Sequence, residues 1–165
     1  MNISGIIKDD ICNGPGFRLS VFCSGCSHHC KGCHNSEYWS YDIGISYNDM
    51  KEEILEELSK STYDGISLLG GEPFDEPNVD DMCDLAKSVR ERFGNTRDIW
   101  IWSGSTYKEL KKRARKSESV KQLLKLCDYL VDGPFVMEQR DTTLRFRGSR
   151  NQNIINLKNG KIERD

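Results

Sequence analysis

The sequence predicts an α/β protein in which a mainly parallel sheet curves into an open, partial (β/α) barrel. Short apolar segments alternate with helical segments along the chain, and the sequence contains no repeat or linker. Alternation of this kind is typical of right-handed βαβ units, which make parallel strands neighbours. The 165 residues are too few for a complete eight-fold barrel of about 250 residues. We therefore expect a single domain over residues 1–165.

The elements follow from hydrophobic periodicity. Alternating or continuous short apolar runs predict strands at 17–22, 65–69, 99–102 and 129–131, and a final strand or hairpin at 153–162. Helical spacing predicts helices at 48–60 and 78–93, and one or two helices within 105–126. Asn48 is the expected cap of the first helix, Gly94 ends the second, and Asn159-Gly160 marks the hairpin turn.

The composition is that of an ordinary soluble protein. The formal net charge is −2, which argues against general nucleic-acid binding, because nucleic-acid-binding domains are usually basic. No stretch approaches the ~20 apolar residues of a membrane span, and residues 1–8 do not resemble a signal peptide. We expect a cytoplasmic protein. The basic run at 111–116 is explained either by a solvated helix face or by a contact with a partner protein.

Seven cysteines are many for a chain of this size, and four of them, Cys23, Cys26, Cys30 and Cys33, lie within eleven residues. Cysteines in reducing compartments rarely form structural disulfides, so crowding of this kind points to metal or cluster ligation. The other three cysteines are scattered along the chain. Cys83 and Cys127 fall at apolar helical positions, where we expect buried side chains.

Three thiolates at i, i+4 and i+7, from Cys26, Cys30 and Cys33, can bind three corners of a [4Fe–4S] cluster. The fourth iron would then be open to a ligand, as the open position is in a catalytic zinc site. Adding Cys23 gives C-x2-C-x3-C-x2-C, which equally suits a closed structural zinc site or a four-cysteine electron-transfer cluster. Cys23 also lies at an inward-facing strand position and is explained as well by simple burial.

A second motif, Gly70-Gly71-Glu72-Pro73, lies between a predicted strand and a predicted helix. Glycines there let the backbone approach a ligand closely, and Glu72 adds a charge, although a plain sharp turn explains the same residues. The cysteine loop, this turn, Ser103-Gly104 and Asp132-Gly133 all follow predicted strands. Because chemistry gathers at the C-terminal ends of parallel strands, we expect the four segments to meet at one rim.

These motifs together resemble the radical S-adenosylmethionine superfamily. More narrowly, the chain resembles glycyl-radical-enzyme activating proteins, especially those of anaerobic ribonucleoside-triphosphate reductases. The matching segments occur in the family's order, at 13–16, 24–26, 32–35, 70–73, 98–104, 131–133 and 147–152. Cys23 departs from the family pattern, and His34-Asn35 is similar to the pyruvate formate-lyase activating proteins. The alternatives are therefore an activase of another glycyl-radical enzyme and a small radical-SAM enzyme that acts on a free substrate.

The resemblance implies a radical-SAM type of fold and a division of labour among the residues. It implies that Cys26, Cys30 and Cys33 ligate a [4Fe–4S] cluster and that Gly70, Gly71 and Glu72 hold the amino group of S-adenosylmethionine. It implies that Gly32, Cys33, His34 and Asn35 contact the adenosyl part, with Ser103 and Asp132 as further candidates. The implied partners are the large subunit of the reductase and an external electron donor such as a flavodoxin. A non-catalytic zinc-binding adaptor is the competing hypothesis.

Overall fold

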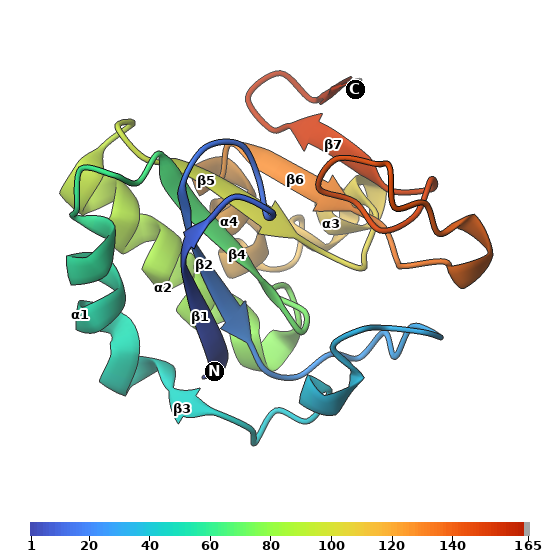
Figure 1. The fold of residues 1–165 in the computed structure, drawn as a ribbon, viewed down its shortest axis with the longest axis horizontal. Helices are drawn as coiled ribbons and strands as arrows, with labels where there is room; N and C mark the ends of the chain where they lie inside the picture. Colours follow the sequence, from blue (N-terminus) through green and yellow to red (C-terminus); the bar gives the residue numbers. More distant parts are fainter. Residues whose placement is uncertain (164–165) are drawn as a thin grey trace.

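The computed structural model describes residues 1–163, which form an open eight-stranded sheet in the order β3-β1-β2-β4-β5-β6-β7-β8 (Figure 1). The strands are β1 (Asn2–Asp10), β2 (Arg18–Cys23), β3 (Ile45–Ser46), β4 (Gly65–Gly70), β5 (Asp98–Trp102), β6 (Tyr129–Asp132), β7 (Asn153–Asn156) and β8 (Lys161–Glu163). The helices are α1 (Tyr47–Leu58), α2 (Glu76–Phe93), α3 (Tyr107–Arg113) and α4 (Glu118–Leu126), with two short 3-10 helices at Ser36–Tyr38 and Met137–Gln139. No helix in this part of the chain is both long and apolar enough to cross a bilayer.

The centre of the sheet is parallel and its margins are antiparallel. Strands β2, β4, β5 and β6 are parallel neighbours, whereas β1, β3, β7 and β8 join in antiparallel pairs. The α/β class is confirmed, but the prediction of a mainly parallel sheet is wrong, since four of the seven pairings between described strands are antiparallel. The βαβ pattern reveals only strands that are joined through helices. β1 reads NISGIIKDD, which has no regular alternation, so no local pattern predicts a strand there.

The two faces of the sheet carry different side chains. Along β2, Leu19 and Val21 join the apolar core shared with the helices, while Arg18 and Ser20 lie on the opposite face. That opposite face carries a smaller cluster around Trp100 on β5. In Figure 1 the helices gather on one side of the sheet, and the segments 11–17 and 133–152 lie across the other. The face that the helices leave uncovered is therefore the one available to a ligand.

Two separate helices, α3 and α4, occupy the region 105–126 where one or two were expected. Thr106 and Glu109 form a reciprocal capping box at the start of α3, and the Ser117 hydroxyl accepts a hydrogen bond from the Val120 N–H at the start of α4. Such caps satisfy N–H groups that a helix start leaves unpaired. The position of α3 matters for the site, because its capping residue follows the Ser103-Gly104 turn directly.

Ion pairs close the N-terminal ends of the parallel strands. The Arg18 side chain is fully buried, and its Nη2 lies 2.6 Å from Asp98 Oδ1, an electrostatic contact rather than an aligned hydrogen bond. Its Nε also donates to Ser67 Oγ at 2.7 Å. Beside β6, the Asp128 carboxylate pairs with Arg90 at 2.6 Å and with Lys158 at 2.8 Å. The charged groups at this end are thus paired within the protein.

Candidate functional site

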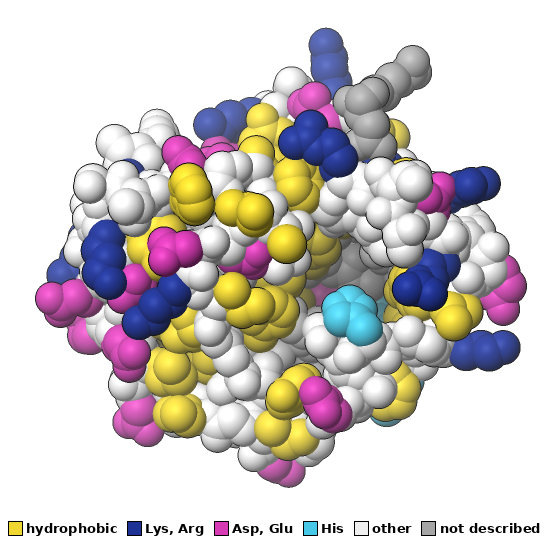
Figure 2. Space-filling view, in the orientation of Figure 1, with side chains coloured by type: hydrophobic (Ala, Val, Ile, Leu, Met, Phe, Trp, Pro, Cys, Tyr) yellow, Lys and Arg dark blue, Asp and Glu magenta, His cyan; other side chains and the backbone are white. Residues whose placement is uncertain are grey.

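A cavity of about 730 Å³ lies on the uncovered face of the sheet. Figure 2 shows the surface hollowed there, beside a histidine side chain (cyan). Its walls come from segments that are distant in sequence: the loop after β1 (12–13), the cysteine loop (26–35), the turn after β4 (71–72), the end of β5 (102–104) and the C-terminal segment (133–152). The cysteine loop, the turn after β4, the end of β5 and Gly133 therefore meet around one cavity, as expected for segments that follow the strands.

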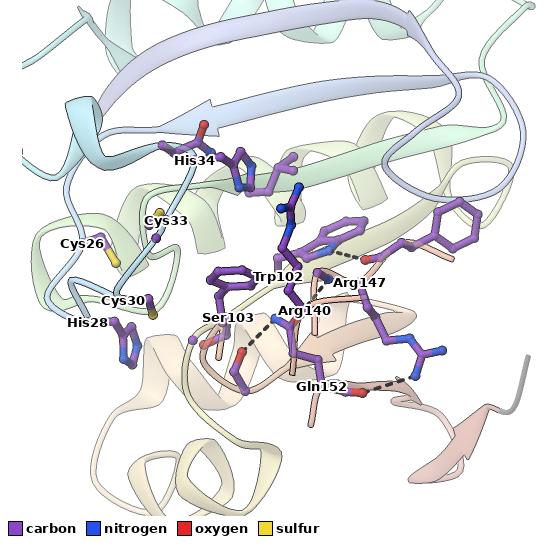
Figure 3. Close-up of a pocket in the computed structure, with 18 of the residues that line it drawn as sticks. Cys26, His28, Cys30, Cys33, His34, Trp102, Ser103, Arg140, Arg147 and Gln152 are labelled. Carbon is purple, nitrogen blue, oxygen red and sulfur yellow. Dashed lines mark hydrogen bonds between the residues drawn. The ribbon is translucent and has the colours of Figure 1, made fainter. Parts of the chain in front are cut away.

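The three cysteines of the predicted cluster motif all line this cavity. Figure 3 shows Cys26, Cys30 and Cys33 on one side of it, with His28 beside them and Arg140 and Arg147 across the space. The backbone N–H of Cys33 donates to Cys30 O at 3.1 Å, so a tight turn brings these two thiols onto the same wall. All seven cysteines are unpaired, which leaves the three thiols available as ligands.

The cysteine loop is held from outside by the start of α2. Asp75 accepts hydrogen bonds from the Ser27 N–H and the Ser27 hydroxyl, both at 2.8 Å, and from the Tyr41 hydroxyl at 2.6 Å. Three residues further on, the buried Asn78 amide donates to Ser24 O at 2.9 Å. Such outer-shell hydrogen bonds orient the ligands of a metal site and fix its geometry.

The glycine turn is joined to the same loop through the backbone. The N–H of Gly71 donates to Cys23 O at 2.7 Å, and the N–H of Glu72 donates to Gly25 O at 2.8 Å. A Cβ at position 71 would lie 2.1 Å from Gly25 O, so only glycine permits this approach. The two motifs that the sequence analysis identified separately therefore form one structural unit.

The Glu72 carboxylate is fully buried and lies where three segments meet. It accepts hydrogen bonds from the Phe74 N–H (3.0 Å), the Ser103 hydroxyl (2.9 Å) and the Gly104 N–H (2.7 Å). His28 Nε2 lies 2.9 Å from Glu72 Oε2, and this bond raises the pKa of His28 against the opposing effect of burial. The structure thus places Glu72 as an anchor between the cysteine loop and the turn after β5.

Cys23 and Cys26 occupy different environments although they are three residues apart. Burial raises the pKa of the Cys23 thiol far above its usual range, and the side chain lies in the apolar core, outside the cavity lining. Burial also raises the pKa of the half-exposed Cys26 thiol, to about 11, with Glu72 adding to the shift and backbone hydrogen bonds of His28 and His29 opposing it. A metal that binds Cys26 therefore has to displace a proton.

The donor set fits an iron–sulfur cluster better than a single zinc ion. Four thiolates around one tetrahedral zinc would lie about 3.8 Å from one another. Among residues 1–163, no three His, Cys, Asp or Glu side chains group closely enough to hold one metal ion. A cluster does not require such convergence, because each thiolate binds a different iron. The three thiols around a shared open cavity meet that requirement, and Cys23 lies behind them.

The other predicted site residues divide into two groups. Gly32, His34, Asn35, Gly71, Glu72 and Ser103 line the cavity together with the three cysteines. Gly70 lies one residue behind the cavity wall, and Asp132 accepts hydrogen bonds from the Tyr107 N–H at 2.7 Å and the Asn153 amide at 3.0 Å. Asp132 therefore fixes the start of α3 to β7, and its neighbour Gly133 lines the cavity instead.

Several residues that line the cavity carry no local signal in the sequence, among them Cys12, Trp102 and Arg140. Cys12 and Arg140 belong to loops without periodicity, so no local pattern indicated which way they face. Trp102 ends an apolar strand, and its Nε1–H donates to Phe146 O at 3.0 Å from the C-terminal segment. Only the tertiary arrangement brings these side chains to the cavity.

Comparison with known proteins gives concordant results. The family model of the 4Fe-4S single cluster domain matches residues 12–155. The anaerobic ribonucleoside-triphosphate reductase-activating protein of Haemophilus influenzae is 36% identical over 161 residues, covering 96% of this chain and 99% of the relative. The protein of the same name from Vibrio cholerae is 39% identical and covers 93% and 97%. That of Enterobacteria phage T4 is 33% identical over the full length of both chains.

The fold, the cysteine cavity and the matching family model define an iron–sulfur protein of the single-cluster [4Fe–4S] class. The similarity to relatives over almost the full length of the chain identifies the family within this class. The chain belongs to the family of anaerobic ribonucleoside-triphosphate reductase-activating proteins. The resemblance inferred from the motifs is confirmed at the level of the family.

Proposed function

We propose that the protein activates an anaerobic ribonucleoside-triphosphate reductase by radical S-adenosylmethionine chemistry at a [4Fe–4S] cluster. One observation carries the proposal: three thiols, and no fourth cysteine of the motif, line a cavity whose wall continues into the Gly71-Glu72 turn. When bound, the cluster and S-adenosylmethionine supply reductive cleavage of the sulfonium S–C bond and a 5′-deoxyadenosyl radical, which removes hydrogen from a glycine Cα of the reductase. The protein supplies binding, orientation and exclusion of competing reactions.

In this proposal the two motifs divide the binding. Cys26, Cys30 and Cys33 would hold the [4Fe–4S] cluster and would leave one of its positions for S-adenosylmethionine. Gly70 and Gly71 offer backbone groups to the ammonium. Glu72 acts mainly by fixing the surrounding segments, since four donors of the chain already surround its carboxylate. A carboxyl group at this position still suits an ammonium nearby.

The segment from Gly32 to Asn35 is proposed to contact the adenosyl part. Gly32, His34 and Asn35 line the cavity on the same wall as Cys30 and Cys33. Gly32 has a φ of +76°, and a Cβ there would lie 2.9 Å from Met137 Sδ of the C-terminal segment. The glycine thus lets the two walls approach while exposing backbone groups to the ligand.

The mixed sheet is proposed to be the partial barrel of the radical-SAM type, with its open side receiving the glycine loop of the reductase. The loop after β1 reaches across that side, because Ser67 donates to Asn13 O and Arg18 donates to Pro15 O. Residues 13–17 then lie where they can hold the incoming loop. An external reductant such as a flavodoxin is proposed to reduce the cluster. The seven unpaired cysteines suit the reducing cytoplasm, where we place the reaction.

Anaerobic reconstitution with iron and sulfide, followed by dithionite reduction and EPR with and without S-adenosylmethionine, tests this function. We expect a reduced-cluster signal that changes when S-adenosylmethionine is added, together with 5′-deoxyadenosine. Incubation with the reductase should then yield a glycyl-radical signal in that partner. A protein that takes up only zinc, or whose cluster signal ignores S-adenosylmethionine, contradicts the proposal. If the glycyl radical forms only in a different glycyl-radical enzyme, the proposed radical chemistry stands and that enzyme replaces the reductase as the target.

A further inference from the structure

The segment from Tyr107 to Lys125, which contains α3 and most of α4, carries an unusual concentration of positive charge. It has eight lysines and arginines and two glutamates, a net charge of +6. The whole chain has a net charge of −2, so the remaining residues together carry −8. Positive charge is therefore segregated onto one pair of helices of an otherwise acidic protein.

The cations share one exposed surface, which we call the α3–α4 face. Lys108, Lys111, Lys112 and Arg115 follow one another at i, i+3, i+4 and i+7, so they project from the same side of α3 and the turn that continues it. Leu110, on the other side of the helix, is buried in the core. Lys111 and Arg115, with Lys116 and Lys121, also border a shallow hollow of about 500 Å³ between the two helices.

Interactions within the protein do not account for this face. In the described part of the chain, Lys108, Lys112, Arg115 and Lys116 have no salt-bridge partner, and Lys121 pairs only with Glu118 at 3.3 Å. The macrodipole favours cations at a helix C-terminus, which suits Lys111 and Lys112. It disfavours Lys108 in the first turn of α3 and Lys116 and Lys121 around the start of α4. These charges therefore oppose local stability and point to a function outside the fold.

The α3–α4 face adjoins the proposed cluster site. The Arg113 guanidinium donates a hydrogen bond to Phe74 O, next to the glycine turn. A Cβ at Gly104, just before α3, would lie 2.5 Å from the His28 ring of the cysteine loop. The turn that leads into α3 thus touches the loop that carries the three thiols.

The same face lies away from the entrance of the cavity. Leu110 of α3 and Leu123 of α4 join the core on the helix-covered side of the sheet, whereas the cavity opens on the uncovered side. A partner that inserts a glycine loop into the cavity and a second partner on the α3–α4 face can therefore bind at the same time. Two separate surfaces are what a protein needs if it must receive an electron while it holds its target.

We infer that the α3–α4 face is the docking surface for an acidic one-electron carrier protein that reduces the cluster; this inference rests on the proposed function. One electron passes from the reduced carrier to the cluster, and the carrier is oxidised by one electron without bond rearrangement. The face is polar and strongly charged, as is typical of a transient encounter in which complementary charge speeds association. Small, weak interfaces are characteristic of electron-transfer complexes.

The test uses the reconstituted holoenzyme and reduced flavodoxin as the acidic carrier. Lys112→Glu combined with Arg115→Glu should lower the second-order rate of cluster reduction by about tenfold at low salt and weaken the dependence of that rate on ionic strength. The affinity for oxidised flavodoxin, measured by titration, should fall in parallel. Lys161→Glu, an equal change of charge at an exposed position of β8, is the control for single variants and should alter either value less than twofold.

Lys108→Glu provides a second variant, because an acidic residue in the first turn of α3 suits the helix dipole and preserves folding. It should slow reduction by flavodoxin as Lys112→Glu does. With dithionite as reductant, all these variants should form 5′-deoxyadenosine and the glycyl radical of the reductase at the rate of the unmodified protein. If unmodified holoenzyme fails with dithionite, the proposed function fails, while the flavodoxin titration still decides the docking surface.

Two results would overturn the inference. One is a flavodoxin affinity and reduction rate that the double reversal leaves unchanged. The other is a double-reversal variant that accepts electrons from flavodoxin normally but no longer activates the reductase under dithionite. That second result would assign the α3–α4 face to the reductase instead.

Discussion

The two ends of the parallel strands satisfy their polar groups in different ways. At the N-terminal end, Arg18 meets Asp98, and Asp128 meets Arg90 and Lys158. At the C-terminal end, the hydrogen bonds of Asp75 and Glu72 hold loops in place around an open cavity. One end is closed by charge pairs within the fold, and the other keeps three thiols exposed to a ligand. Changes at the first end should act on stability, and changes at the second on chemistry.

Cys26→Ala should give the largest effect on chemistry. Loss of one of three cluster ligands should lower cluster content and reduce 5′-deoxyadenosine formation by at least about 100-fold. The thermal unfolding temperature of the cluster-free protein should change little, because the thiol is only partly buried. Iron and sulfide analysis and product assay measure these effects.

Cys23→Ala is the matched control at the end of β2. It should keep the cluster and the activity, because its side chain lies in the core, and it should lower stability by about 1–2 kcal/mol through the small cavity created. If Cys23→Ala and Cys26→Ala lost the cluster equally, Cys23 would also be a ligand. The separation between a buried strand cysteine and the loop ligands would then be wrong.

Arg18→Met tests the opposite end of the strands. Removing the guanidinium leaves Asp98 without its cation and leaves buried acceptors unpaired. The free energy of unfolding measured in urea should therefore fall by about 3–5 kcal/mol. Arg92→Met is the control, since its contact with Glu52 is exposed and spans 3.6 Å, and it should change stability by less than about 0.5 kcal/mol. If the Arg18→Met protein were as stable as this control, the N-terminal end would not be the stabilising one.

Asp75→Asn should have an intermediate effect, on both the stability of the fold and the retention of the cluster. The amide loses the charge-assisted acceptance of hydrogen bonds from Ser27 and Tyr41, which should cost about 1–3 kcal/mol. Release of iron to a chelator should become about tenfold faster, because the cysteine loop is less firmly oriented. Asp49→Asn, at an exposed site in the first turn of α1, should leave the release rate unchanged. Equal release rates in the two variants would remove Asp75 from the support of the loop.

The smallest effect concerns pH. Burial raises the pKa of Asp128, but hydrogen bonds from Lys158, Arg90 and the Ile99 N–H outweigh it, so the pKa is lowered from its ordinary 3.8. The resulting stabilisation is fully present above that value and is lost as the pH falls through the lower pKa of the folded state. In urea titrations of the cluster-free protein between roughly pH 6 and pH 3, where carboxyl groups titrate, Asp128→Asn should flatten the acid loss of stability. An unchanged slope would contradict this role.

Local patterns predicted the parallel centre of the fold and the β7–β8 hairpin at one margin, but not the strands of the other margin, β1 and β3. The apolar runs at β2, β4, β5 and β6 and the helical faces of α1 and α2 lie within a few residues of their expected positions. The alternation at β2 correctly placed Cys23 inward. The antiparallel strand β1 was missed because burial of its residues is irregular, and its pairing depends on β2 and β3 rather than on a pattern of its own.

The sequence predicts the motifs of the candidate site but not the residues that hold these motifs in place. Cysteine spacing and the Gly-Gly turn are local signals, so Cys26, Cys30, Cys33 and Gly71 could be identified from the sequence. Asp75 and Asn78 act across about 50 residues of sequence, and no spacing rule links them to the cysteine loop. Arg140 reaches the cavity only through the path of the C-terminal segment.

From Cys26 to Ser46 the chain contains no buried residue. This segment adds nothing to the apolar core, so the strands and helices can assemble before any iron arrives. We therefore expect biogenesis in two stages, with a folded apoprotein that receives its cluster afterwards through the open cavity. Backbone amides of the segment should exchange with solvent deuterium much faster than those of β4 before loading and become protected on loading. Cluster binding would then order this segment after the rest of the chain has folded.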